Sequence, residues 1–337
     1  MVNGPFGTGK IADYTGVINE VPLKKNKVSS LGLFEPESLN VSTAIIDVDG
    51  YDIGVLGTQS RRSPAKRIKH ENAKQFPIIV PHISLEDYVY PEDVEEKRMP
   101  GSTELDKLSR VRSKRLTKMA GDLDLTHEYF RLSAIKGVTK DGLGNTLFDA
   151  YTVLGKTQKA VEFDMTAASG LKTQLLDVKR YIEENNKTGG SIGEIICLCS
   201  PSWFNALINN AEIAEAYGNQ VGLANPLRDD LRADFVFQNI VFMEYSGSVV
   251  MESGSTENLI EENVAYFLPR GVSGMFREFY APKTDMNYVG TDGILKYAAE
   301  YSDPEGRWLK LTAESNALMI NTRPEMVVKF TNKKASS

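Results

Sequence analysis

The sequence predicts an α+β chain with two domains and two projections that belong to neither domain. Three observations predict this: a first stretch of about forty residues whose apolar side chains are scattered, a helical pattern too long for a compact domain, and a strand–helix alternation after it. The length of 337 residues, 41% of them hydrophobic, is enough for two cores.

The composition excludes several classes of protein. Cys197 and Cys199 are the two cysteines, too few for a disulfide framework or for a zinc site. No run of about 18 apolar residues is present that could span a membrane. The net charge of −6 argues against a surface that binds nucleic acid throughout, so any basic patch must be local.

The two projections are an N-terminal arm and a hairpin. Residues 1–40 predict an extended N-terminal arm, because their apolar residues are mostly single. Residues 41–84 predict a long β-hairpin, with the second strand at residues 76–83. Between its strands lies the basic segment, residues 59–74, with six cations against one glutamate. The segment cannot be core, so we expect a hairpin with a charged tip that projects from the body.

An acidic segment and a long helix follow the hairpin. Residues 84–98 contain six carboxylates. The spacing of apolar residues predicts a helix over residues 103–136, about 50 Å long, that ends at Gly137. The other face of this helix is basic, through Lys107, Arg110, Arg112, Lys114, Arg115 and Lys118.

The remaining chain alternates strands and helices, which predicts a compact mixed domain. We expect helices at residues 171–185 and from Pro201 onward, and strands at residues 147–154, 160–165, 192–198, 234–244, 309–311, 317–320 and 326–330. We place Cys197 and Cys199 on a strand as buried free thiols that point to opposite faces.

The templates of catalysis do not fit. Gly7-Thr8-Gly9-Lys10 lacks the strand and the spacing of a phosphate loop, the three histidines are scattered, and no GxSxG pattern occurs. We expect no enzyme activity, no catalytic residue, no cofactor and no metal site. A cytoplasmic enzyme built on residues 151–306 remains the alternative of a different class.

The basic segment has three interpretations: it docks on an acidic surface of a neighbouring copy, it binds nucleic-acid phosphates, or it is a solvated loop. It lacks the aromatic residues that bind single strands, and the acidic segment of another copy offers a partner, so we favour the first. The predicted inter-subunit contact residues are Arg61, Arg62, Lys66, Arg67, Lys69, Glu86, Asp87, Glu92, Asp93, Glu95 and Glu96.

Several local patterns occur together and in a fixed order. Residues 61–94 combine the charged loop, a strand and an acidic descent into the long helix. Residues 195–204 join an apolar strand to a proline and an aromatic-bearing helix, and residues 323–328 begin the last strand. In this order the sequence resembles the major capsid proteins of tailed phages, with their Hong Kong 97 type fold. More narrowly, it is similar to the capsid E family of the phage lambda major head protein.

The resemblance implies a shell subunit. Such a subunit self-assembles into pentamers and hexamers that form the icosahedral head of a tailed double-stranded DNA phage. The implied parts are an N-terminal arm (1–40), an extended loop (41–84), a peripheral domain with a spine helix (85–150), an axial domain (151–306) and C-terminal strands that return to the peripheral domain (307–337). An encapsulin-like nanocompartment shell is the alternative.

The resemblance also implies partners. Because no long leader precedes the arm, we expect a separate scaffolding protein, together with a portal and room for a decoration protein. The shell encloses double-stranded DNA without sequence-specific binding, and no membrane is involved. The protein would reside in the capsid of the virion after assembly in the host cytoplasm. We expect no covalent Lys–Asn cross-link between subunits, although Lys66 and Lys69 lie on the loop.

Overall fold

The structure is a computed structural model that describes residues 11–20, 27–48, 74–95, 104–186, 192–214 and 235–333. The chain divides into two compact units, and each combines segments that are distant in the sequence. The first unit consists of residues 1–45, 77–131 and 277–319, and the second of residues 46–76, 132–276 and 320–337.

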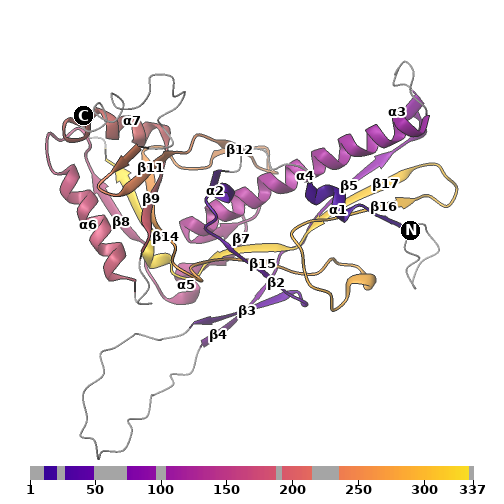
Figure 1. The fold of residues 1–337 in the computed structure, drawn as a ribbon, viewed down its shortest axis with the longest axis horizontal. Helices are drawn as coiled ribbons and strands as arrows, with labels where there is room; N and C mark the ends of the chain where they lie inside the picture. The colour runs from indigo at the N-terminus through magenta and orange to yellow at the C-terminus, as the bar shows by residue number, and fades with distance from the viewer. Residues whose placement is uncertain are drawn as a thin grey trace, which may run out of the picture. The chain divides into compact units, whose positions relative to one another are not determined.

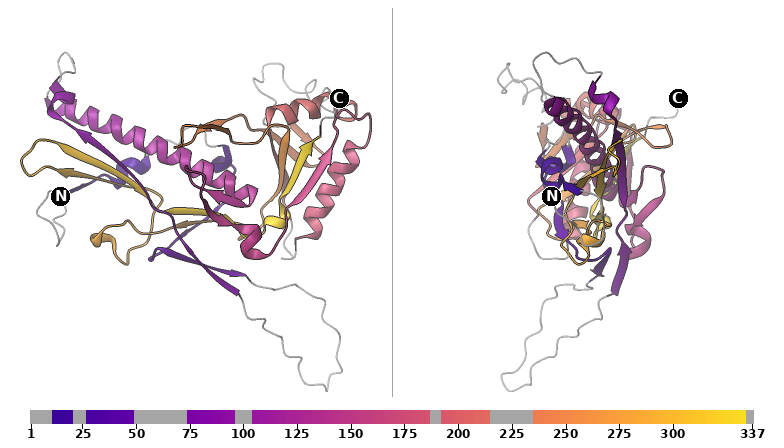
Figure 2. Two further views of the ribbon diagram at one scale, coloured as in Figure 1. Left: turned by 180° about the vertical axis from the view of Figure 1, so that it is seen from behind. Right: turned by 90° about the vertical axis from the view of Figure 1, so that its right-hand side faces the viewer.

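A four-stranded sheet forms the body of the first unit (Figure 1). Its antiparallel strands follow the order β1 (Ile11–Asp13), β16 (Tyr297–Ser302), β17 (Leu309–Ser315) and β5 (Ile83–Val89). Helix α4 (Glu104–Lys136) runs along this sheet (Figure 2). The apolar stripe of α4 is buried in one core with side chains of the sheet: Val111, Leu116, Met119 and Leu123 with Val89, Leu311 and Ala313.

Helix α4 confirms the long helix predicted from apolar spacing. It contains 33 residues and gives way to a turn at Gly137, whose φ of 91° is in the left-handed region that favours glycine. Residue 103, where the predicted helix begins, lies outside the described residues.

The described part of the predicted arm packs on its own chain. Strand β1 pairs with β16, and Ile18 of α1 (Thr15–Glu20) is fully buried in the core of the first unit. After α2 (Lys27–Ser30), strand β2 (Glu35–Ser38) pairs in parallel with β15 (Phe276–Tyr280), in a sheet completed by β18 (Ala317–Asn321). Ile18, Val28 and Leu31 are therefore buried singly, while Val17 is exposed, so the described part of the arm packs on the chain rather than extending from it.

The base of the predicted hairpin is confirmed. Strands β3 (Thr43–Val48) and β4 (Lys74–Ile79) pair as a two-stranded sheet, and the chain between them lies outside the described residues. The single strand predicted at residues 76–83 is wrong, because residues 80–82 separate β4 from β5. Pro81 lies in this break, and proline has no backbone N–H to continue a ladder. Helix α3 (Pro91–Glu95) follows β5.

A mixed six-stranded sheet forms the body of the second unit. Its order is β10 (Phe235–Phe237), β11 (Ile240–Glu244), β9 (Glu194–Cys199), β14 (Val264–Arg270), β19 (Val328–Asn332) and β8 (Lys159–Phe163). Trp203 of α7 (Pro201–Asn209) is fully buried and packs on the rings of Phe242, Phe267 and Phe330 from three of these strands. Helix α6 (Leu171–Glu184) buries its apolar stripe as expected.

Short elements complete the second unit. They are the hairpins β6 (Val138–Lys140)–β7 (Thr146–Asp149) and β12 (Ser248–Val250)–β13 (Thr256–Asn258), helix α5 (Ala150–Leu154) and the 3-10 turn η3 (Pro324–Met326). The 3-10 turn η2 (Met286–Tyr288) belongs to the first unit.

Three further local predictions are wrong. Residues 147–154 divide into β7 and α5, because the side chain of Asp149 accepts hydrogen bonds from Tyr151 N and Thr152 N and so begins a helix. The single strand predicted at residues 234–244 is instead a hairpin over the described residues 235–244, with positive φ at Gln238 and Asn239. Cys197 and Cys199 are buried and free as expected, but residues two apart on β9 share a face, and burial and the neighbouring Cys199 raise the pKa of Cys197.

The two compact units do not follow the limits of the expected domains, and those domains remain a prediction. Residues 277–306, expected in the axial domain, belong to the first unit and contribute β16. Strand β19, expected to return to the peripheral domain, lies between β14 and β8 in the second unit. Pairing between distant strands decides both assignments.

Candidate assembly surfaces

The predicted contact residues are described only in part. The five cations Arg61, Arg62, Lys66, Arg67 and Lys69, together with Glu96, lie outside the described residues. The five other carboxylates lie on β5 and α3 of the first unit: Glu86, Asp87, Glu92, Asp93 and Glu95.

Three of these carboxylates form ion pairs within the chain. Lys310 Nζ lies 2.5 Å from Glu86 Oε1, and this hydrogen bond raises the pKa of Lys310. The Arg115 guanidinium lies 2.6 Å from both Asp87 Oδ1 and Asp93 Oδ2. Arg115 thereby joins α4 to β5 and α3. These three carboxylates stabilise the first unit. Fewer of the predicted contact carboxylates are therefore available to a neighbouring copy.

Glu92 and Glu95 remain exposed on α3 and form no ion pair with another described residue. An apolar groove with a cavity volume of about 340 Å³ lies beside them. Its lining residues are Val89, Tyr90, Pro91, Val94, Leu108, Gly306, Trp308 and Leu309. We call this groove with Glu92 and Glu95 the acidic groove. The apolar floor was not predicted from the sequence; the one local signal for it is Tyr90, which lies within the acidic segment, whereas Trp308 is distant in the sequence.

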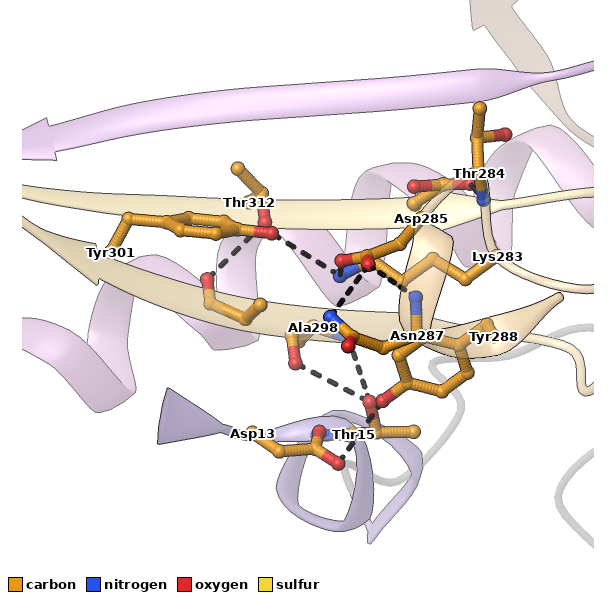
Figure 3. A network of polar contacts seen from close by, with 12 residues as sticks. Asp13, Thr15, Lys283, Thr284, Asp285, Asn287, Tyr288, Ala298, Tyr301 and Thr312 are labelled. Carbon is orange, nitrogen blue, oxygen red and sulfur yellow. Dashed lines mark hydrogen bonds and ion pairs between the residues drawn. The ribbon is translucent and has the colours of Figure 1, made fainter. Parts of the chain in front are cut away.

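A polar network fastens the N-terminal segment to the first unit (Figure 3). Lys283 Nζ lies 5.4 Å from the ring centroid of Tyr288 and 5.9 Å from that of Tyr301. The Tyr288 hydroxyl donates a 3.3 Å hydrogen bond to Asp13 Oδ2. Burial opposes the charge of Asp13, but hydrogen bonds from Thr15 and Tyr288 outweigh it and lower the pKa of Asp13. The network therefore holds β1 beside β16.

Buried polar groups of α4 are also structural. Lys296 Nζ lies 2.9 Å from Asp124 Oδ1, with both side chains nearly inaccessible. His127 Nε2 lies 2.7 Å from Ser315 Oγ, and burial and the charges of Arg131 and Lys296 lower the pKa of His127 to about 3. His127 is therefore neutral at physiological pH, too weak a base to suit general base catalysis.

Other kinds of site are not found in the described part of the chain. No group of three or more potential metal-ligating side chains occurs among the described residues. None of the described helices is long and apolar enough to cross a membrane.

Comparison with known proteins decides the family. The family model described as phage major capsid protein E matches residues 10–332. The chain belongs to the phage major capsid protein E family. This capsid protein is 32% identical over 333 residues to the major capsid protein of Pseudomonas phage KPP10, an alignment covering 94% of this chain and 95% of the relative.

Solved structures show the same fold. A protein assigned as the capsid protein of a prophage in Escherichia coli CFT073 has a TM-score of 0.57 at 12% identity, covering 93% of each chain. A chain of the capsid of Cyanophage A-1(L) has a TM-score of 0.50 at 13% identity, covering 90% of this chain and 92% of its own. These structures confirm the predicted Hong Kong 97 type fold, and the family match with the similarity to the KPP10 protein confirms the function of a tailed-phage major capsid protein. The nanocompartment alternative gains no better support.

Proposed function

We propose that this capsid protein self-assembles into pentamers and hexamers that form the icosahedral head of a tailed double-stranded DNA phage. The family match over residues 10–332, which draws on both units, carries the proposal. The role is structural, without catalysis or a cofactor. Assembly takes place in the host cytoplasm with a separate scaffolding protein and a portal. A decoration protein is a further candidate partner of the assembled shell.

The parts of the fold take distinct roles in this proposal. The first unit, with α4 and the four-stranded sheet, acts as the peripheral domain, and the second unit acts as the axial domain that gathers copies around an axis. The hairpin that begins with β3 and β4 is the extended loop that reaches a neighbouring copy. A chain that exposes complementary surfaces at different places binds its copies head to tail. The assembly is closed when repeating the rotation from one copy to the next leads back to the first copy.

The acidic groove is the proposed docking site for the basic segment of the next copy. Glu92 and Glu95 offer negative charge that no described side chain neutralises. The groove beside them accepts apolar side chains, and the basic segment carries Ile68 between Arg67 and Lys69. Complementary charge then sets the register of the contact, and the apolar floor adds buried area.

Imaging of the purified protein tests the proposed function. The chain is expressed with the scaffolding protein of its own phage, fractionated by size and imaged by negative-stain electron microscopy. We expect closed polyhedral particles of uniform size in the void fraction. A small soluble oligomer that stays small at high protein concentration and with scaffolding protein would contradict a shell subunit.

A further inference from the structure

Helix α4 turns a row of cations to solvent. Arg110, Lys114 and Lys118 are exposed and follow one another at intervals of four residues, which places them on one face. With a rise of 1.5 Å per residue, successive charges are about 6 Å apart along the helix. The row therefore presents a line of positive charge along a little over two turns of α4.

The other cations of the predicted basic face are not available to a partner in the same way. Arg112 forms a two-point ion pair with Glu300 of β16, and Arg115 binds Asp87 and Asp93. Lys114 and Lys118, in contrast, form no ion pair with another described residue. On the described part of the basic face, Arg112 and Arg115 therefore hold the sheet and α3, while Lys114 and Lys118 face solvent.

The surroundings of the row suit a polyanion. No aspartate or glutamate occurs from residue 107 to residue 121, in a chain whose net charge is −6. The exposed side chains between the cations include the hydroxyls of Ser113 and Thr117, which can donate hydrogen bonds to phosphate oxygens. Asp122 is the first exposed carboxylate beyond the row.

We propose that the row of Arg110, Lys114 and Lys118 contacts the phosphate backbone of double-stranded DNA, and that this face of α4 lines the interior of the shell. The inference rests on the proposed function, because a closed shell filled with DNA is what gives the subunit an inner face. Each copy contacts few phosphates, so its binding is weak and independent of sequence. Many copies in one shell add such contacts without holding the DNA tightly at any point.

Salt-dependent DNA binding tests the contact. Unassembled subunits are titrated into a fluorescent random-sequence duplex, and anisotropy is measured over a series of salt concentrations. The variant Lys114→Gln with Lys118→Gln should lower the affinity roughly tenfold or more at low salt, and should reduce the slope of log K against log salt by about 2. The matched control is Lys140→Gln with Lys179→Gln, which removes the same charge from the second unit and should leave the slope unchanged.

Three outcomes would overturn the contact. Equal losses in both variants would show that net charge alone governs binding, and undetectable binding of the wild type at low salt would remove the contact altogether. Normal DNA binding by the Lys114→Gln, Lys118→Gln variant, together with malformed shells, would assign the row to an acidic scaffolding protein instead.

Thiol labelling of intact shells tests the orientation of the face. Cys197 and Cys199 are buried, whereas Lys114→Cys places a thiol at an exposed position, so the reagent distinguishes the new thiol from the native ones. A maleimide on a bulky polymer should label dissociated subunits at position 114 but not intact shells. Labelling of intact shells would place the row on the outside. If no shells form at all, the proposed function fails, whereas the DNA titration still reports on the row.

Discussion

A buried ion pair on α4 joins the helix to β15. Arg131 and Glu278 have side-chain exposures of 7% and 5%, and Tyr280 also donates a hydrogen bond to Glu278. Because removal of one partner leaves an unpaired charge in the core, we expect Arg131→Met to lower the free energy of unfolding by about 3–5 kcal/mol. Urea denaturation of unassembled subunits measures this loss.

The exposed pair of Arg180 and Asp177 offers the matched control. Both side chains are more than half exposed, so Arg180→Met should change the free energy of unfolding by less than about 1 kcal/mol. A loss for Arg131→Met as small as that for Arg180→Met would show that water reaches Glu278 in the folded subunit.

Gly137 is required by space as well as by backbone conformation. A Cβ at this position would lie 2.3 Å from Cε2 of Tyr151, and the φ of 91° strains any other residue. Gly144 has a similar φ of 88° but no atom within 4 Å of such a Cβ. We therefore expect Gly137→Ala to destabilise the subunit more than Gly144→Ala, by roughly 1–3 kcal/mol. Equal losses in thermal or urea unfolding would mean that the Tyr151 ring moves aside freely.

The cap of α5 makes stability depend on pH. Burial opposes the charge of Asp149, but hydrogen bonds from Thr152 and Tyr151 outweigh it and lower its pKa below the ordinary 3.8. The stabilisation is therefore complete above the unfolded pKa and is lost as pH falls through the lower folded value. Asn also caps helices but does not titrate, so Asp149→Asn should match the wild type at pH 7 and lose less stability on acidification. Urea unfolding at pH values from 7 to 3 measures both proteins. An equal loss of unfolding free energy in the wild type and in Asp149→Asn would contradict this role.

At the scale of elements, the helices with a strong apolar period could be predicted from the sequence. The stripe of α6 at Leu171, Leu175, Val178 and Ile182 is entirely buried, and α7 begins at Pro201 after the capping Ser200, as expected. Local periodicity and capping decide such elements, and both are written within a few residues of the chain.

Strand boundaries and strand partners were harder to predict. The hairpin of β10 and β11 turns at Gln238 and Asn239 without the glycine that usually marks such a turn, so its apolar run predicts a single strand. Strand β19 pairs with β14 and β8, from which it is separated by more than fifty residues. A single sequence carries no signal for such pairings.

Only part of the candidate assembly surface could be predicted, because the rest depends on contacts between distant segments. The acidic segment was visible as a run of charge, but its intrachain partners Arg115 and Lys310 come from other elements. Tertiary structure therefore separates the carboxylates that stabilise β5 and α3 from Glu92 and Glu95, which remain exposed. The apolar groove beside them depends on Trp308 and Leu309, from β17 and the turn before it.

At the scale of the whole molecule, the net charge of −6 is a sum of separated regions. The basic segment and the acid-free stretch of α4 carry positive charge, while Glu92 and Glu95 expose negative charge on α3. The basic segment and the acidic pair on α3 suit head-to-tail contacts between copies, because these two patches of opposite sign lie at different places on the chain.

Charge reversal tests this arrangement in the assembling protein. Changing Arg61, Arg62, Arg67 and Lys69 to Glu should prevent shell formation, because the loop of one copy would then meet Glu92 and Glu95 of the next with like charge. The change should leave the subunit folded, which circular dichroism checks, while negative-stain particle counts measure assembly. Normal particle counts would show that the loop does not dock through its charge.

The combined reversal distinguishes docking on the acidic groove from the other roles of the loop. Glu92→Lys with Glu95→Lys should impair assembly alone, yet restore particles in part when added to the reversed loop, because opposite charges then meet again. If the loop bound DNA instead, the changes on α3 would not restore particles to the variant with the reversed loop. If the loop were only solvated, every variant would form particles. The coupling between the two sets of substitutions, measured as particle yield in a double-mutant cycle, therefore reports whether these surfaces meet.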